Sequence, residues 1–276
     1  MNCQPLVTFH DGRTIPQIGL GVWQTPNEEA VSAVKTALEA GYRHIDTAAG
    51  YHNEQGVGEG LKASGLGRDD VFITTKVRNE DQGYETALAA VDNSLELLDT
   101  DYLDLCLIHW PSPWRGKYVE TWKALVQLKA DGKIRSIGVS NFEAEHLDRI
   151  ISETGETPVL NQIELHPCFQ QTAMRAVNAE RNIATESWSP LGQGKLIEDR
   201  TIGTIAAKYG RNPAQIIIRW HLDSGLIVIP KSVTPSRIVD NFKVFDFQLD
   251  AEDLARLKAL DSADGRIGPD PMMATF

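Results

Sequence analysis

The sequence has few cysteines, a deficit of basic side chains and only short apolar runs. Its three cysteines, Cys3, Cys106 and Cys168, lie far apart and form no CxxC pair. This spacing disfavours a disulfide framework, a zinc site and an iron–sulfur site, so we expect no metal and reduced thiols in a cytoplasmic protein. Lysine and arginine number 27 against 38 acidic residues, a formal net charge of −11, whereas a general nucleic-acid-binding protein normally carries a basic face.

Long apolar segments are also missing. The apolar runs fall far short of the roughly 18 residues that suggest a membrane-spanning helix. The first residues, MNCQPLVTFHDGRTIPQ, lack the basic segment and the apolar core of a secretory signal. We therefore expect a cytoplasmic monomer with neither a membrane nor a nucleic-acid partner.

Short β-rich runs alternate with helical patterns from residue 18 onward. Strands that alternate with helices imply parallel βαβ units, and eight such units in 276 residues predict an α/β fold, a single (β/α)8 TIM barrel domain over residues 1–276. An open doubly wound sheet is the alternative, but Gly19 and Gly21 are not followed by the third glycine of its first turn. The eight strands are expected at residues 18–23, 44–48, 71–76, 103–110, 136–141, 160–165, 184–189 and 227–232.

Additional elements are expected at both ends of the chain. Residues 6–9 and 14–15 flank an Asp-Gly turn signal and predict an N-terminal β-hairpin, and extra helices are expected near the C-terminus. The stretch TPNE at 25–28 resembles a capping box with proline at the first helical position, and Gly41 is expected to end that helix.

Four polar side chains, Asp46, Tyr51, Lys76 and His109, stand at or just after the ends of successive predicted strands. The active sites of such barrels occupy the carboxyl ends of the strands and the loops that follow. A buried lysine needs a counter-charge, which Asp46 can supply to Lys76. Because a nearby ammonium favours a phenolate, we expect the pKa of Tyr51 to fall from about 10 toward neutral pH, which makes it a usable general acid. His109 can hydrogen-bond the same substrate oxygen.

Together these groups form a proton-donating site for an oxygen that gains negative charge, as carbonyl reduction requires. Each residue alone has a structural alternative: an ordinary buried ion pair for Lys76, a core histidine for His109 and a loop aromatic for Tyr51. Their joint placement at the ends of successive strands favours the catalytic interpretation.

Six stretches carry a family resemblance: GYRHIDTAAGYHNEQGVG (41–58), FITTK (72–76), LIHWP (107–111), SIGVSNF (136–142), NQIELHP (161–167) and IPKSV (229–233) with Arg237 and Asn241. Across essentially its whole length the chain resembles the aldo-keto reductases. Through ESWSPLGQGK (186–195) it is most similar to the bacterial 2,5-diketo-gluconate reductases. The resemblance implies a catalytic tetrad of Asp46, Tyr51, Lys76 and His109. In the family the tyrosine protonates the carbonyl oxygen, the histidine orients the carbonyl, and the Asp–Lys pair tunes the tyrosine.

The loops after the last two predicted strands have the features of a phosphate site. Barrels often bind phosphate there, and the helix that begins near Pro235 offers free backbone N–H groups. Lys231 and Arg237 are cationic donors suited to a 2′-phosphate. The resemblance places these residues at the adenosine 2′-phosphate and therefore implies NADPH.

The resemblance also assigns contacts to the rest of this cofactor. Ser140, Asn141 and Gln162 would bind the nicotinamide carboxamide, Trp188 would stack on the ring, and Asn241 would contact the adenine. The full set of implied cofactor residues is Ser140, Asn141, Gln162, Trp188, Ser189, Leu191, Lys231, Ser232, Val233, Thr234, Arg237 and Asn241.

The substrate pocket is expected to have aromatic walls beside Tyr51 and His109. Trp23 and Trp110 are expected to line it, and Trp114 is a further candidate from the following loop.

The predicted reaction is the NADPH-dependent reduction of small aldehydes and ketones to alcohols. The candidate substrates are 2,5-diketo-gluconate-like sugar acids, methylglyoxal and β-keto esters. Arg78 either favours carboxylated and hydroxylated substrates or faces solvent, and the apolar tail at 272–276 is a candidate for flanking the pocket.

Two other functions for the barrel stay open as alternatives. The first is a cofactor-sensing regulatory or binding module, against which the intact tetrad counts. The second is a metal-dependent hydrolase, which usually clusters histidines at strand ends, whereas the histidines here are scattered along the chain.

Overall fold

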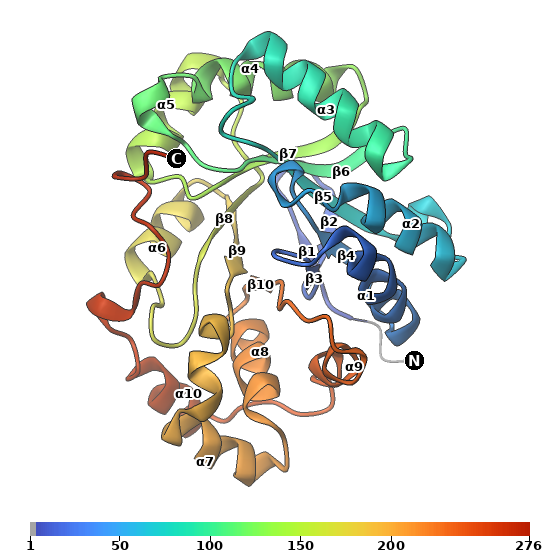
Figure 1. Cartoon of the computed structure of the whole chain (residues 1–276). Helices are drawn as coiled ribbons and strands as arrows, with labels where there is room; N and C mark the ends of the chain where they lie inside the picture. Colours follow the sequence, from blue (N-terminus) through green and yellow to red (C-terminus); the bar gives the residue numbers. More distant parts are fainter. Residues whose placement is uncertain (1–3) are drawn as a thin grey trace.

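The computed structural model describes residues 4–276 (Figure 1), so Cys3 lies outside the described residues. The expected N-terminal hairpin is confirmed. Strands β1 (Leu6–Thr8) and β2 (Thr14–Pro16) pair antiparallel, with Val7 opposite Ile15.

Eight parallel strands form one sheet in chain order, and the sheet closes on itself. Bridges join Ile18 to Val228 and Gly21 to Lys231, and the backbone N–H of Gly19 donates to the carbonyl of Val228 at 2.9 Å. These contacts connect the first and last strands and confirm the predicted (β/α)8 barrel. The strands are β3 (Leu20–Gly21), β4 (His44–Asp46), β5 (Phe72–Val77), β6 (Leu103–Ile108), β7 (Ile134–Ser140), β8 (Leu160–Glu164), β9 (Ala184–Trp188) and β10 (Ile227–Val228).

The helices surround this sheet on its outer side, as Figure 1 shows. The extra C-terminal helices are confirmed, because two helices follow β9 and one more follows the helix after β10. The helices are α1 (Asn27–Ala40), α2 (Glu54–Ser64), α3 (Tyr84–Leu98), α4 (Tyr118–Ala130), α5 (Ala144–Thr154), α6 (Thr172–Glu180), α7 (Arg200–Tyr209), α8 (Pro213–Asp223), α9 (Pro235–Phe242) and α10 (Ala251–Lys258).

The start of α1 differs from the prediction. Pro26 is the N-cap residue rather than the first helical residue, and the hydroxyl of Thr25 is buried without a hydrogen-bond partner among the described residues. The capping box is therefore absent. Asn27 instead connects two helices, because its Oδ1 accepts a hydrogen bond from the N–H of Gly56 at 2.7 Å. A Cβ atom at Gly56 would lie 2.1 Å from the carbonyl oxygen of Asn27, so this glycine permits the close approach of α1 and α2.

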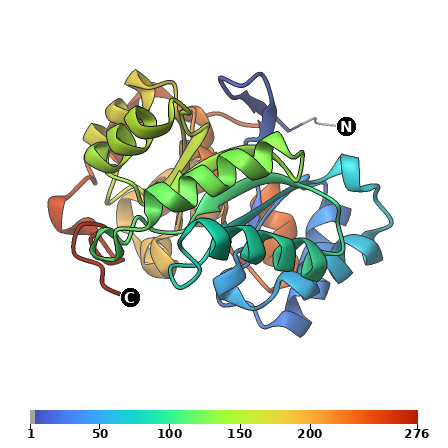
Figure 2. The same ribbon diagram turned by 90° about the horizontal axis from the view of Figure 1, so that it is seen from above.

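The two ends of the barrel are covered by different segments. At the amino ends of the strands, Phe9 and Ile15 of the hairpin region pack on Leu105, Leu160 and Ile227 inside the barrel. Figure 2 shows this hairpin (dark blue) on one side of the molecule and the C-terminal tail, residues 266–276 (red), on the other. The tail lies over the carboxyl ends of the strands, where a Cβ atom at Gly268 would meet Trp188.

The side chain of Glu164 holds this tail. Its Oε1 accepts from the N–H of Ile267 at 2.6 Å, and its Oε2 accepts from the N–H of Gly268 at 2.8 Å. Charge-assisted hydrogen bonds of this kind are about twice as strong as neutral ones, so Glu164 fixes where the tail crosses the barrel.

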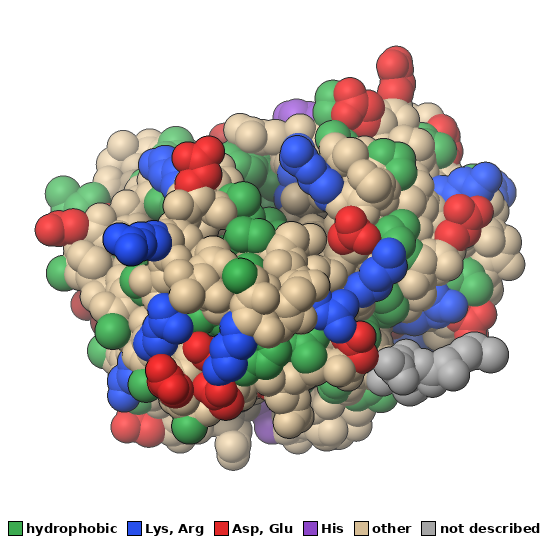
Figure 3. Space-filling model, turned by 90° about the horizontal axis from the view of Figure 1, so that it is seen from below, with side chains coloured by type: hydrophobic (Ala, Val, Ile, Leu, Met, Phe, Trp, Pro, Cys, Tyr) green, Lys and Arg blue, Asp and Glu red, His purple; other side chains and the backbone are tan. Residues whose placement is uncertain are grey.

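The surface carries charges of both signs. On the face drawn in Figure 3, basic and acidic side chains are interspersed. Ion pairs at the surface of the protein join Lys133 to Asp92 and Arg211 to Asp246. Within residues 4–276, no helix combines the length and the apolar character needed to cross a membrane.

Candidate active site

The structure brings the four residues of the predicted tetrad together at the carboxyl ends of β4, β5 and β6. Lys76 of β5 donates from Nζ to Asp46 Oδ1 at 2.6 Å and to the carbonyl oxygen of Thr47 at 2.8 Å. The exposed fractions of the Lys76 and Asp46 side chains are 0% and 2%. The expected ion pair is therefore present and buried, where removal of one partner leaves an uncompensated charge.

Tyr51 lies directly beside this ion pair. It ends the short 3-10 helix Ala49–Tyr51 that follows β4, and Lys76 Nζ lies 5.2 Å from the centroid of its ring. His109, which follows β6, packs edge-on against the same ring, with 5.5 Å between the two centroids. The phenol, the ammonium and the imidazole thus converge on one point at the mouth of the barrel.

The protonation states at this point differ in one respect from the expectation. Burial raises the pKa of Tyr51 above its ordinary 10.0, because it disfavours the phenolate more than the neighbouring Lys76 favours it. The predicted fall of this pKa is therefore wrong. Burial lowers the pKa of Lys76, but Asp46 and Tyr51 raise it by more, and the net result is a rise that keeps the ammonium charged. Burial and the charge of Lys76 lower the pKa of His109 to about 3, so its imidazole is neutral.

The residues expected at the nicotinamide are linked by hydrogen bonds at the ends of β7, β8 and β9. Ser140 donates from Oγ to the backbone carbonyl of Gln162 at 2.8 Å. Asn141 donates from Nδ2 to the carbonyl of His109 at 3.0 Å, and its Oδ1 accepts from Trp188 Nε1 at 2.8 Å. Asn141 has φ of 63°, a conformation that the surrounding structure must hold in place. These contacts fix the side chains of Asn141 and Trp188 relative to His109, and that of Ser140 relative to the backbone of Gln162.

The sequence did not lead us to predict Glu186, which Gln162 contacts inside the barrel. Its Nε2 donates to Asp46 Oδ2 at 2.8 Å and to Glu186 Oε2 at 2.7 Å. Glu186 is fully buried, and burial and Asp46 raise its pKa to about 8. The sequence contained a usable signal, since Glu186 precedes Trp188 by two positions in a strand and therefore lies on the same face.

The residues expected at the cofactor phosphates lie on the other side of the barrel mouth, after β9 and β10. Lys231 and Arg237 are exposed, and among the described residues neither forms an ion pair. Ser232 accepts from the N–H of Thr234 at 3.2 Å, and α9 begins directly after Thr234. Asn241 is buried on α9, while Ser189, Leu191 and Val233 are half-buried.

The aromatic side chains of the expected substrate pocket separate into two groups. Trp110 lies near Trp188, with 6.4 Å between centroids, and edge-on to Phe276 of the tail at 5.3 Å. Trp23 and Trp114 are 42% and 54% exposed and, within residues 4–276, stack on none of these three rings. The aromatic wall is therefore built by Trp110, Trp188 and the tail.

Arg78 does not present a free guanidinium at the rim. Its Nε and Nη2 donate to the two carboxylate oxygens of Asp81 at 2.7 and 3.0 Å. A bidentate pair of this type neutralises the charge locally, so the structure gives little support to recognition of a substrate carboxylate by Arg78.

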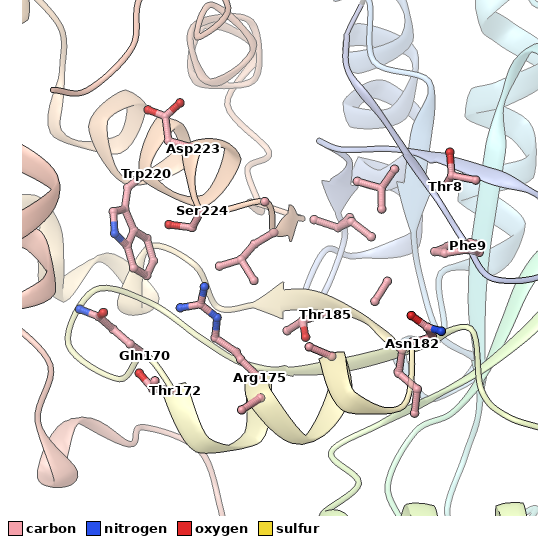
Figure 4. A pocket seen from close by; sticks show the side chains of 18 of the residues that line it. Thr8, Phe9, Gln170, Thr172, Arg175, Asn182, Thr185, Trp220, Asp223 and Ser224 are labelled. Atoms are coloured by element: carbon pink, nitrogen blue, oxygen red, sulfur yellow. The ribbon is translucent and has the colours of Figure 1, made fainter. Parts of the chain in front are cut away.

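A cavity of about 710 Å³ lies at the opposite end of the barrel, near the first residues of β9 and β10. Figure 4 shows Arg175, Trp220 and Phe9 among the side chains that line it. It shares no residue with the predicted site. Within the described residues, no group of three or more His, Cys, Asp or Glu side chains could hold a metal ion.

Sequence comparison places these features in a family. The model of the aldo/keto reductase family matches residues 17–262. An aldo-keto reductase of Mycolicibacterium smegmatis is 55% identical over 272 residues, which cover 99% of this chain and 98% of that relative. Methylglyoxal reductase DkgA of Escherichia coli K12 is 54% identical over 268 residues, which cover 96% of each chain.

Solved structures agree with the sequence match. A crystal structure of a Gox0644 mutant in complex with NADPH has a TM-score of 0.96 and 55% identity, and 99% of each chain is covered. A Bombyx mori aldo-keto reductase in complex with NADP has a TM-score of 0.87 and 36% identity, covering 95% of this chain and 94% of that chain. The match across nearly the whole chain, in sequence and in fold, shows that this protein belongs to the aldo/keto reductase family of oxidoreductases.

Proposed function

We propose that the protein reduces small aldehydes and ketones to alcohols with NADPH, and that Tyr51 is the proton donor. The observation that carries this proposal is the buried ion pair of Lys76 and Asp46, 2.6 Å apart, with the Lys76 ammonium beside the Tyr51 ring. A buried charge pair next to a phenol and a neutral imidazole at the carboxyl ends of barrel strands is suited to proton transfer to an oxyanion.

The residues at the barrel mouth fit an NADPH molecule. Lys231 and Arg237 are exposed cations beside the N-terminus of α9, a setting that favours the 2′-phosphate. Ser189, Leu191, Ser232, Val233 and Thr234 would hold the remaining phosphates and ribose, and Asn241 the adenine. The neighbours solved with NADPH and with NADP support this choice. When bound, NADPH supplies the hydride.

The chain's own groups carry the proton. Tyr51 holds its proton at neutral pH because its pKa is raised, so it is present as the acid that reduction needs. It donates that proton to the carbonyl oxygen as negative charge develops there, and the ammonium of Lys76 stabilises the phenolate that remains. Asp46 and the carbonyl of Thr47 hold the ammonium in place. The neutral imidazole of His109 donates an N–H to the same carbonyl oxygen.

The substrate class follows from the walls of the pocket. Trp110 and Phe276 give an apolar aromatic surface, and Asp81 neutralises Arg78, so uncharged carbonyls such as methylglyoxal fit better than sugar acids. The E. coli and Yersinia pestis relatives named methylglyoxal reductase DkgA, 54% and 56% identical, support the same choice. 2,5-Diketo-gluconate and β-keto esters are the comparison substrates, and kcat/KM is the measure of preference.

Replacement of Tyr51 by phenylalanine tests the proposal. Because the phenol oxygen is the proton donor, Tyr51→Phe should lower kcat for methylglyoxal by about 100-fold or more, while the Kd for NADPH stays near that of the wild type. Tyr84→Phe, at the exposed start of α3, is the matched control and should keep full activity.

Two results would contradict the assignment. Wild-type turnover in Tyr51→Phe would remove Tyr51 from the chemistry. A wild-type protein that binds NADPH but oxidises it with none of these carbonyls would favour the alternative function, a cofactor-sensing regulatory or binding module.

A further inference from the structure

Glu186 is a buried carboxyl group that the proposed proton transfer does not use. It lies in β9 opposite Gln162 of β8 in the strand register, and its side chain is 0% exposed. Its Oε2 accepts from Gln162 Nε2 at 2.7 Å. Its Oε1 has no hydrogen-bond partner among the described residues. His44 Nε2 is 3.8 Å away, and burial and Lys76 lower the pKa of this histidine to about 3, so it is neutral. Burying a carboxyl oxygen without a hydrogen-bond partner costs free energy. What Glu186 contributes to the site therefore depends on its one remaining contact, with Gln162.

The two contacts of Gln162 determine the orientation of its amide. An amide NH2 has two donors, and both are used, one by Asp46 Oδ2 at 2.8 Å and one by Glu186 Oε2. Asp46 directs its other oxygen to the ammonium of Lys76. If the amide turned over, its carbonyl oxygen would face the carboxylate oxygen of Asp46, and Glu186 Oε2 would lose its donor. The amide is therefore locked with Nε2 toward the barrel interior, and Oε1 is left as a free acceptor.

We infer that Glu186 is a positioning residue for the cofactor: together with Asp46 it locks the Gln162 amide so that Oε1 is presented to the NH2 of the nicotinamide carboxamide. This inference rests on the proposed function, because it assumes that the nicotinamide is bound beside Gln162. A locked acceptor selects one rotation of the carboxamide and thereby orients the ring whose carbon delivers the hydride.

The charge of Glu186 determines which substitutions preserve this role. The groups that face it are Asp46 and His44 from β4, Tyr51 after β4, Lys76 from β5 and Gln162 from β8. Its register partner on β10, Ile227, is apolar. Burial and the negative charge of Asp46 raise its pKa, and an unpartnered Oε1 fits a neutral carboxyl better than a carboxylate. A neutral carboxyl accepts through its carbonyl oxygen, and a glutamine offers the same acceptor at the same size.

The experiment compares Glu186→Gln with Glu186→Val, using Ser187→Ala as a control in the same strand. Ser187 is buried and its Oγ has no partner among residues 4–276, so this change perturbs β9 without touching Gln162. Two ligands are titrated by tryptophan fluorescence. NADPH carries the nicotinamide, and adenosine 2′,5′-bisphosphate carries only the adenine end and its 2′-phosphate.

We expect the loss of the Glu186 carboxyl to weaken the binding of NADPH but not that of the bisphosphate. Glu186→Val should weaken NADPH binding by about tenfold, the equivalent of one well-formed hydrogen bond lost together with its orientation, and should leave the bisphosphate unchanged. Glu186→Gln and Ser187→Ala should bind both ligands as the wild type does. Equal weakening of both ligands by Glu186→Val, or a Glu186→Gln variant as impaired as Glu186→Val, would overturn the inference.

A measurement on the wild type keeps the inference testable if Glu186→Val does not fold. In 3-acetylpyridine adenine dinucleotide phosphate a methyl group replaces the carboxamide NH2. The wild type and Glu186→Gln should bind this analogue several-fold more weakly than NADP+, and equal affinities would refute the role of Oε1. A wild type that binds no NADPH would refute the proposed function, whereas a wild type that binds NADPH with no such selectivity refutes only the inference about Glu186.

Discussion

The buried carboxyl of Glu186 makes the stability of the folded protein depend on pH, and Glu186→Gln should remove that dependence. The folded environment raises the pKa of this group from 4.5 to about 8, because burial and the charge of Asp46 disfavour the carboxylate. In the unfolded chain the same carboxyl loses its proton near its ordinary value. Between these two pH values this carboxyl holds its proton in the folded protein but not in the unfolded chain, so its contribution to the free energy of unfolding falls as the pH rises.

The size of the effect follows from the same two values. The stabilising contribution of the neutral carboxyl is complete below pH 4.5 and is lost as the pH rises through about 8. The corresponding loss in free energy of unfolding is on the order of 5 kcal/mol over this window. Glutamine has no proton to lose, so the variant should match the wild type at pH 5 and exceed its stability increasingly toward pH 9.

Urea denaturation followed by tryptophan fluorescence at five pH values from about 5 to 9 measures this difference. Glu96→Gln, an exposed position on α3, is the matched control, and its difference from the wild type should be flat. A flat difference for Glu186→Gln as well would refute the reasoning, because it would mean that the folded environment does not disfavour the carboxylate.

Two further predictions concern the cofactor and the helix packing. Lys231→Ala and Arg237→Ala should each raise the KM for NADPH roughly tenfold or more with little change for NADH, since only NADPH carries the 2′-phosphate; equal effects on both cofactors in a steady-state assay would remove these residues from that phosphate. Gly56→Ala should lower the free energy of unfolding by about 1–3 kcal/mol in urea titrations, because its Cβ would lie 2.1 Å from the Asn27 carbonyl. Gly203→Ala, on α7 with nothing within 4 Å of the new Cβ, should instead stabilise the protein by about 0.5–1 kcal/mol, and a similar loss in both variants would contradict the packing argument.

The barrel could be predicted because alternation of strands and helices is a local property of the sequence. The predicted strand boundaries are less accurate where the first and last strands pair to close the barrel. Residues 18–23 and 227–232 were expected as full strands, yet β3 and β10 have two residues each. Pairing there continues only as isolated bridges at Ile18 and Lys231, and Pro230 has no N–H to donate. The extent of a strand thus depends on its neighbour as well as on its own residues.

The tetrad could be grouped from the sequence because parallel strands all end at the same edge. Its protonation could not, because the pKa of Tyr51 depends on how much protein surrounds the phenol, and burial outweighs the adjacent ammonium. The contact of Gln162 with Glu186 depends on the register of β8 against β9. The attachment of the tail to Glu164 joins residues more than a hundred positions apart. Strand alternation indicates that Glu186 shares a face with Trp188, but no local signal specifies the partner of Glu186 or that of Glu164.

The hairpin at the amino ends of the strands has a consequence for proton exchange with bulk water. Phe9 and Ile15 fill that end of the barrel, so within the described chain the open approach to Asp46, Lys76 and Glu186 is the mouth where ligands are proposed to bind. A bound ligand would then block the exchange of protons as well as of water through the mouth. The charge state that these interior groups have when a ligand arrives would be retained until it leaves, and the mouth would set the rate at which they return to equilibrium with the surrounding pH.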